Sequence, residues 1–205
     1  RIHYTAPHPL YMDEEMISAL TLPHHVNYLH LPVQSGSDKI LAKMNRRHTR
    51  LDYINTIKKV RQVRPKIAIG TDIIVGFCGE TEQDFLDTLA LYQECDFDIA
   101  YLAQYSERSG TAAAKAFSDD VPAIEKRSRW DRLQTLMEET VERKNRLYLG
   151  EVVSVLVDRC ENGECFGNSL EMKLVSFPGD TKLVGKIVPV RVSFTDKWIL
   201  RGEMI

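Results

Sequence analysis

The stretch Gly70-Thr71-Asp72-Ile73-Ile74-Val75-Gly76-Phe77-Cys78-Gly79-Glu80-Thr81 decides the fold. It starts as an apolar strand, continues through two closely spaced glycines and ends at a threonine that can cap a helix. Asp72 interrupts the apolar strand, and burial of an unpaired carboxylate costs several kcal/mol. We therefore expect Asp72 to meet a basic side chain or a ribose hydroxyl, while Ile74 offers apolar surface to a flat base. The glycine spacing matches neither GxGxxG nor a P-loop.

Three other short apolar runs are also followed by polar or glycine-bearing loops. With the run above, they predict strands at Ile2–Thr5, Tyr28–Val33, Ile67–Val75 and Ile99–Tyr105, the first three followed by helices. Thr81 and Asp84 have the spacing of a capping pair for one of these helices. This alternation predicts an α/β fold with a parallel sheet, in which the loops after the strands share one edge and form the binding face.

Two of these loops carry further candidate binding residues. The second strand leads into His30–Ser37, whose amide, hydroxyls and glycine suit a ribose or a carboxylate. A polar turn that only caps the next helix is the alternative. The fourth strand ends in Gln104–Thr111, which predicts either one wall of a cleft or a charged loop rim.

Composition limits the classes of function. The 205 residues hold 27 basic and 29 acidic side chains, so no overall charge attracts nucleic acid or a membrane. No run approaches the roughly 20 apolar residues of a membrane span, and we expect a cytoplasmic protein. The four cysteines show neither CxxC nor CxxxCxxC spacing, so no metal ligands are assigned. Because Arg1 stands in the middle of a strand-like pattern, we expect the chain to be cut from a larger fold.

A long charged helix separates this region from a β-rich end. The helix is predicted from about Pro122 to Tyr148, with either a solvated face or a basic end along a phosphate backbone. After Gly150, turn signals separate short strands, which predicts a small β-barrel or sandwich. The predicted domains are 1–120, 121–149 and 150–205, and the predicted strands of the last are Val152–Val157, Leu174–Phe177, Ile187–Val192 and Trp198–Gly202.

Two cysteines flank a turn in this β-rich end. Cys160 and Cys165 enclose Asn162-Gly163, a pair that favours a two-residue hairpin and would set the cysteines opposite each other. A disulfide is geometrically possible. In a reducing cytosol we expect free thiols instead. We expect Cys78 and Cys95 to be buried.

Six motifs occur in order along the chain: HLPVQSGS (30–37), TDIIVGFxGET (71–81), YSxRxGTxAA (105–114), LVxFPGD (174–180), LxGKIVPV (183–190) and LRGE (200–203). Together they resemble the tRNA methylthiotransferases of the radical S-adenosylmethionine (SAM) superfamily, the MiaB type, over essentially the whole chain. The resemblance implies a partial (β/α) radical SAM barrel with parallel strands, corresponding to the third to sixth of six strands. It also implies a small all-β TRAM barrel at the end of the chain.

The resemblance also implies roles for individual residues. Gln34, Arg46 and Asp72 would hold the methionine carboxylate and the ribose of SAM, and Ile74 would pack against adenine. A guanidinium matches a carboxylate, and an aspartate accepts hydrogen bonds from ribose hydroxyls. No residue is assigned a catalytic role. The other residues expected to line the cofactor site are Ser35, Glu80, Ser106 and Arg108.

The implied reaction transfers a methylthio group to C2 of N6-isopentenyladenosine beside the anticodon. It uses SAM and two [4Fe–4S] clusters, whose ligands we expect outside this chain, so this chain alone should be inactive. The implied partners are the anticodon stem-loop of tRNA, a reductant and a sulfur source, and we expect a monomer. The alternatives are threonylcarbamoyladenosine or a ribosomal-protein aspartate as substrate, or an RNA-binding module without catalysis.

Two departures from the family pattern are visible. Cys78 stands where the family usually has proline, and the segment 167–172 lacks the arginine that the tRNA-modifying family tends to carry there. The second departure weakens the case for tight tRNA contact. Phe177, Phe194 and Trp198 could stack on bases, but we expect them in the core.

Overall fold

The computed structural model describes all residues 1–205, which divide into two compact units. The α/β unit comprises Tyr4–Pro23 and Leu29–Met137. The barrel unit comprises Arg1–His3, His24–Tyr28 and Glu138–Ile205. The boundary falls within the long helix α6 (Ala123–Arg146). No helix combines the length and the apolar character that a membrane span needs.

A three-stranded sheet organises the α/β unit. Its strands β1 (Tyr28–His30), β2 (Ala68–Val75) and β3 (Ile99–Gln104) lie in that order, and β2 pairs with β3 in parallel. Along β2 the side chains alternate, so Ile73 and Val75 are buried while Asp72 and Ile74 are partly exposed. The predicted parallel α/β fold is confirmed, with one packed face and one open face.

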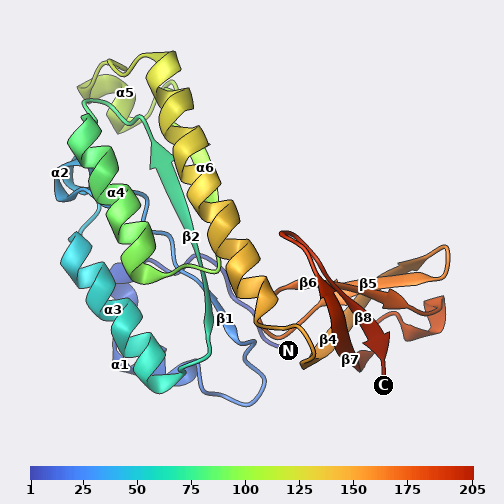
Figure 1. The fold of residues 1–205 in the computed structure, drawn as a ribbon. Coiled ribbons are helices and arrows are strands. Elements are labelled where there is room, and N and C mark those ends of the chain that lie inside the picture. Colours follow the sequence, from blue (N-terminus) through green and yellow to red (C-terminus); the bar gives the residue numbers. More distant parts are fainter. The chain divides into compact units, whose positions relative to one another are not determined.

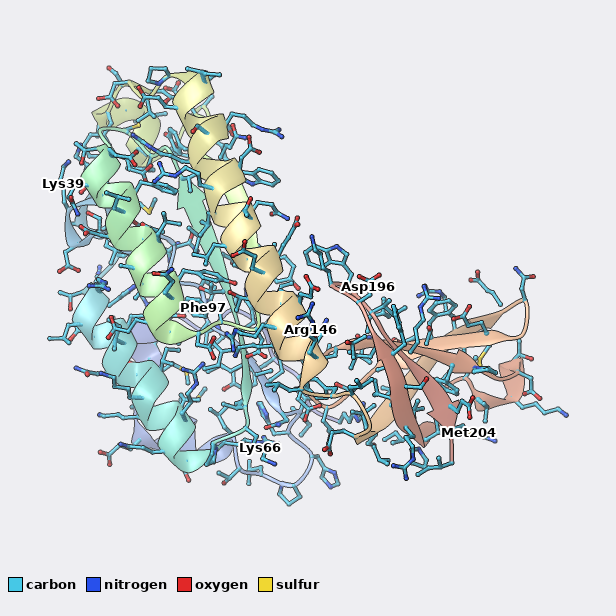
Figure 2. All side chains as sticks on the ribbon, in the orientation of Figure 1. Lys39, Lys66, Phe97, Arg146, Asp196 and Met204 are labelled. Carbon is cyan, nitrogen blue, oxygen red and sulfur yellow. A yellow bond between two sulfur atoms is a disulfide. The ribbon has the colours of Figure 1, made fainter.

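Helices cover the packed face of this sheet (Figure 1). The Tyr53 hydroxyl on α3 donates to the Leu31 carbonyl at 2.7 Å. Phe97, which is labelled in Figure 2, is fully buried. The centroid of its ring lies 6.1 Å from that of Tyr53 and 5.4 Å from that of Tyr92. The helices that precede α6 are η1 (Pro9–Tyr11), α1 (Glu14–Ala19), α2 (Asp38–Lys43), α3 (Arg50–Val63), α4 (Glu82–Cys95) and α5 (Ala112–Ala116).

The start of α4 confirms the predicted capping pair. The Asp84 amide donates to the Thr81 hydroxyl oxygen, and the Thr81 amide donates to the Asp84 carboxylate at 2.8 Å. This reciprocal capping satisfies two of the amides that a helix start leaves without helical partners. It fixes where the helix begins after the β2 loop.

The predicted strand Ile2–Thr5 is wrong. Only single bridges form there, between Ile2 and His25 and between Thr5 and His30. Ala6 then takes a positive φ of 55°, which turns the chain away from an extended path. Although the residues alternate as in a strand, no continuous ladder of hydrogen bonds forms, so this segment remains irregular.

The barrel unit contains a closed barrel with the strand order β4-β5-β6-β8-β7, which confirms the predicted small all-β domain. Valines alternate into its core, among them Val155, Val175 and Val190. The sequence patterns missed β5 because its residues ECFGN include no β-branched side chain. The strands are β4 (Val152–Glu161), β5 (Glu164–Asn168), β6 (Leu174–Pro178), β7 (Ile187–Thr195) and β8 (Leu200–Met204), with η2 (Thr181–Leu183) between β6 and β7.

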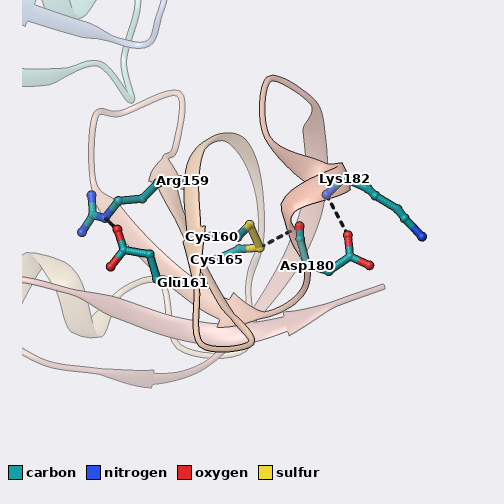
Figure 3. The surroundings of a disulfide bond; sticks show 6 residues. All are labelled: Arg159, Cys160, Glu161, Cys165, Asp180 and Lys182. Carbon is teal, nitrogen blue, oxygen red and sulfur yellow. Dashed lines mark hydrogen bonds and ion pairs between the residues drawn. A yellow bond between two sulfur atoms is a disulfide. The ribbon is translucent and has the colours of Figure 1, made fainter.

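A disulfide joins Cys160 to Cys165 across the β4–β5 hairpin (Figure 3), so the expectation of free thiols at these two positions is wrong. Asn162 and Gly163 form the turn with φ of 53° and 82°. In such a two-residue hairpin, the pair one step beyond the turn-flanking residues is the closely spaced kind, which brings the two sulfurs together. Cys78 and Cys95 are free and buried, as predicted.

Candidate functional site

Gln34 lies where the chain leaves the first strand, and its backbone is unusual. Its amide donates to the Asp72 carbonyl at 2.8 Å, and its carbonyl accepts from the Ile74 amide at 2.9 Å. These bonds hold Gln34 beside the end of β2 with a positive φ of 76°. A residue other than glycine pays conformational strain there, and such strain clusters at binding sites.

The loop that follows Gln34 is tied to α4. The Gly36 amide donates to the Thr88 hydroxyl at 2.9 Å, and the Ser37 hydroxyl donates to the Asp84 carboxylate at 2.7 Å. A Cβ on Gly36 would lie 2.5 Å from the backbone of Thr88, so only glycine permits this approach. Ser35 is fully buried, with its hydroxyl 3.4 Å from that of Thr88. The structure therefore places Ser35 against α4.

Asp84 anchors this loop through several donors. Burial acts to raise its pKa, but hydrogen bonds from Lys39, Thr81 and Ser37 prevail and hold the pKa well below its ordinary value. The ammonium of Lys39 lies 2.7 Å from the carboxylate. One ionised side chain thus joins the α4 start to the loop after Gln34.

Asp72 lies on the open side of the sheet, beside His30. Its Oδ1 lies 3.1 Å from Nε2 of His30, and its side chain is 36% exposed. The His30 ring lies 5.4 Å from the ring of Tyr101, the residue paired with Asp72 in the parallel register. Ile74 is the next residue of β2 on this side, and its partner in β3 is Ala103. We call the side chains of His30, Asp72, Ile74 and Tyr101 the open-face row.

Arg46 adds a cation near this row. Burial lowers the pKa of the Arg46 guanidinium, and the charge of Asp72 acts in the opposite direction. The opposite effects show that the charges of Arg46 and Asp72 interact. The structure thus places a guanidinium within electrostatic range of the Asp72 carboxylate, and it holds the Gln34 backbone against β2, the strand that carries Asp72 and Ile74.

Glu80 is held elsewhere. It is 5% exposed, and it accepts from the Gly76 amide at 2.7 Å and from Arg129 of α6 at 3.0 Å. Burial raises the pKa of Glu80, although the Gly76 amide and the Arg129 charge oppose this. The Glu80 carboxylate fixes the β2 loop to α6 and does not lie in the open-face row.

Ser106 and Arg108 lie on the exposed loop after β3. Their side chains make no hydrogen bond or ion pair, while the Arg108 carbonyl accepts from the Thr111 hydroxyl at 2.9 Å. The structure leaves both side chains open to solvent and does not join them to Asp72. Nearby, burial and a hydrogen bond with Cys78 raise the pKa of Tyr105 to about 12.

The sequence patterns missed His30 and Tyr101 as candidate site residues. His30 heads the quoted loop motif, and a titratable residue at a strand end was the available signal. Tyr101 is recognised only from the register that pairs it with Asp72. Tyr101 is 60% exposed, which no local pattern indicates.

Comparisons with known proteins identify both parts of the chain. Residues 1–92 match the Radical SAM superfamily, and residues 146–205 match the TRAM domain. Coproporphyrinogen III oxidase from Escherichia coli, described as a Radical SAM enzyme, is similar with a TM-score of 0.56 and 17% identity. That likeness covers 67% of this chain and 32% of the oxidase, and it concerns the fold alone.

Two curated relatives are named tRNA-2-methylthio-N(6)-dimethylallyladenosine synthase. The protein of Geobacillus thermodenitrificans is 41% identical over 208 residues, and that of Acetivibrio thermocellus is 42% identical over 209 residues. Both alignments cover 100% of this chain but 40% and 43% of the relatives, so the chain spans less than half of their length. The chain therefore carries a segment of the Radical SAM superfamily followed by a TRAM domain, and over its whole length it is similar to these synthases.

Proposed function

We propose that the protein carrying this chain transfers a methylthio group to C2 of N6-isopentenyladenosine beside the anticodon of tRNA. The relatives that align with the whole chain are named for the corresponding dimethylallyladenosine product. The observation that carries the proposal is that the Gln34 backbone is bonded to β2 at Asp72 and Ile74, while the charge of Arg46 acts on Asp72. Because the chain spans about 40% of these relatives, the activity is proposed for the whole protein, and residues 1–205 alone should be inactive.

The open-face row suits the chemical groups of SAM. The exposed Asp72 carboxylate offers acceptors to the ribose hydroxyls, and the Arg46 guanidinium offers a fork to the methionine carboxylate. Ile74 offers an apolar surface to adenine, and Gln34 borders the same strand end. We propose that Ser35 and Glu80 position the loops around this site, and that Ser106 and Arg108 meet ligand from the β3 loop. Bound SAM with a reduced cluster supplies hydrogen abstraction from C–H bonds too strong for acid–base chemistry.

Two of the four cysteines of this chain form a disulfide, Cys160 with Cys165. The other two, Cys78 and Cys95, are free and buried at separate positions of the sequence. We propose that two [4Fe–4S] clusters are held by cysteines outside residues 1–205, in the length that the relatives have in addition. A reductant and a sulfur source complete this proposal.

The barrel unit is the proposed contact with the anticodon stem-loop. Phe177 is core, as predicted, but Phe194 and Trp198 are 53% and 49% exposed, so their predicted burial is wrong. Exposed aromatic rings stack on unpaired bases, and cations beside them contact phosphates.

Because the basic and acidic charges of the chain nearly cancel, we expect weak, salt-sensitive RNA binding by a monomer in the cytoplasm. Binding that does not change with salt would contradict the phosphate contacts.

The test uses the complete protein encoded by the reading frame that contains this chain. After anaerobic reconstitution with iron and sulfide, it is incubated with SAM, a reductant and tRNA that carries isopentenyladenosine. Mass spectrometry of the digested tRNA should show the methylthio derivative, and Asp72→Ala should abolish it. The matched control Asp87→Ala changes a partly exposed carboxylate of α4 and should retain activity.

The same assay separates the alternatives. Methylthio transfer only to threonylcarbamoyladenosine, or only to an aspartate of a ribosomal protein, would keep the reaction and refute the proposed substrate. RNA binding without SAM cleavage by the reconstituted protein would favour the non-catalytic RNA-binding module.

A further inference from the structure

We propose that His30 is a positioning residue that orients Asp72 to receive a vicinal diol such as the ribose of a nucleoside. This inference rests on the proposed function, because it takes Asp72 as the ribose contact. His30 is the first residue of the HLPVQSGS motif, but the resemblance assigns no role to its side chain.

The geometry leaves one oxygen of Asp72 available. The imidazole Nε2 of His30 lies 3.1 Å from Oδ1, and no protein donor reaches Oδ2. The His30 side chain is 11% exposed while that of Asp72 is 36% exposed, so the contact is buried behind an open carboxylate. A carboxylate has acceptor positions on both oxygens. With Oδ1 fixed, the remaining acceptors point to the open face, where a diol can use them.

The ring of His30 is itself held in place. His30 is in β1 and pairs with Thr5, and its ring packs at 60° against Tyr101 with centroids 5.4 Å apart. Because β2 lies between β1 and β3, the two rings meet over the strand that carries Asp72. His30 of β1 therefore contacts the carboxylate directly, and the Tyr101 ring of β3 packs against the His30 ring that makes this contact.

Orientation before binding explains why this contact matters for a ligand. A carboxylate that rotates freely loses conformational entropy when it accepts two hydroxyls, and fixing it beforehand removes this cost. If the His30–Asp72 pair were only structural, loss of His30 would affect ligands with and without the hydroxyls equally. A positioning role instead predicts that loss of His30 weakens the binding of ligands that carry the diol and leaves the others unchanged.

The test measures dissociation constants by NMR titration of residues 1–205 with adenosine and with 2′,3′-dideoxyadenosine. The variants are His30→Ala, His30→Gln, Asp72→Asn and the double change His30→Ala with Asp72→Asn. We expect the unchanged chain to prefer adenosine and His30→Ala to weaken adenosine binding roughly tenfold, as removal of a hydrogen bond to a charged group does. Dideoxyadenosine binding should not change, and the double variant should bind like Asp72→Asn.

Conservative variants separate positioning from folding. His30→Gln keeps a donor near the position of Nε2 and should recover most of the adenosine affinity. If His30→Ala does not fold, His30→Phe keeps an aromatic ring that can pack against Tyr101 and removes the ring nitrogens, including the donor to Asp72. His30→Phe should then show the same selective loss for adenosine.

The outcomes distinguish this inference from the proposed function. If Asp72→Asn keeps the preference for adenosine, or if the unchanged chain has none, the proposed ribose contact fails and the inference fails with it. If Asp72→Asn removes the preference but His30→Ala and His30→Phe do not, only the role of His30 is overturned. Equal weakening of both ligands by the His30 variants would also overturn it, because that result indicates a structural role.

Discussion

At the residue scale, Gln34 combines an unfavourable backbone conformation with a place at the proposed cofactor site. Its φ of 76° suits glycine, and a side chain there costs about 1 kcal/mol or more. The strain is maintained because the amide and carbonyl of Gln34 both bond to β2. Because glycine would adopt this backbone conformation at lower cost, the presence of a side chain at this strand end is consistent with selection for binding.

A pair of substitutions tests this strain. Gln34→Gly should be more stable than Gln34→Ala by about 1 kcal/mol in urea unfolding, because only alanine retains the penalty of a positive φ. The control pair Lys58→Gly and Lys58→Ala, at an exposed position of helix α3, should show the opposite order. Equal stability of the two Gln34 variants would contradict the strain.

At the element scale, the start of α4 holds the loop that carries Gln34. Thr88 serves both the Gly36 amide and the Ser35 hydroxyl, at 2.9 and 3.4 Å. Thr88→Val keeps the shape and leaves the buried Gly36 amide without this acceptor, so unfolding free energy should fall by about 1–3 kcal/mol. Thr56→Val is the matched control, because Thr56 is partly exposed on α3 and its hydroxyl bonds only to the Asp52 carbonyl. An effect no larger than that of the control would refute the tie between loop and helix.

The pH dependence of stability tests the anchor at Asp84. Its folded-state pKa lies well below the ordinary value, so its stabilisation is complete above about pH 4 and is lost as the pH falls through the folded-state pKa. Unfolding measured from pH 5 to pH 2 should therefore be less pH-dependent for Asp84→Asn than for the unchanged chain. Asp87→Asn, whose carboxylate accepts only from Gln83, serves as the control. Parallel curves for Asp84→Asn and the unchanged chain would contradict the account.

These contacts show what the sequence can and cannot predict. The strand ends, the Thr81 cap and the alternating pattern that places Asp72 and Ile74 on one side of a strand are local patterns. These patterns, together with the family motifs, predict the fold class. The partners of Ser35 and Glu80 lie 53 and 49 residues away, at Thr88 and Arg129, so no local pattern indicated that both side chains face helices. His30 and Tyr101 became candidates only through the register of the sheet.

At the scale of the whole molecule, the disulfide should affect one unit only. It joins two residues of the barrel unit that are five positions apart, and loop entropy for so short a closure corresponds to about 2 kcal/mol. Addition of dithiothreitol should lower hydrogen-exchange protection of β4 and β5 amides while β2 amides remain unchanged. Unchanged protection in β4 and β5 would show that the hairpin is held by its ladder alone.

The central claim is that the open-face row and its neighbours form a SAM-binding wall. The most direct measurement is a map of amide chemical-shift changes in residues 1–205 on titration with SAM. The account predicts changes concentrated at Gln34, Asp72, Ile74 and Tyr101, and their loss in folded Asp72→Ala. Absence of changes at these four residues, or changes confined to the outer surfaces of α3 and α4, would contradict it.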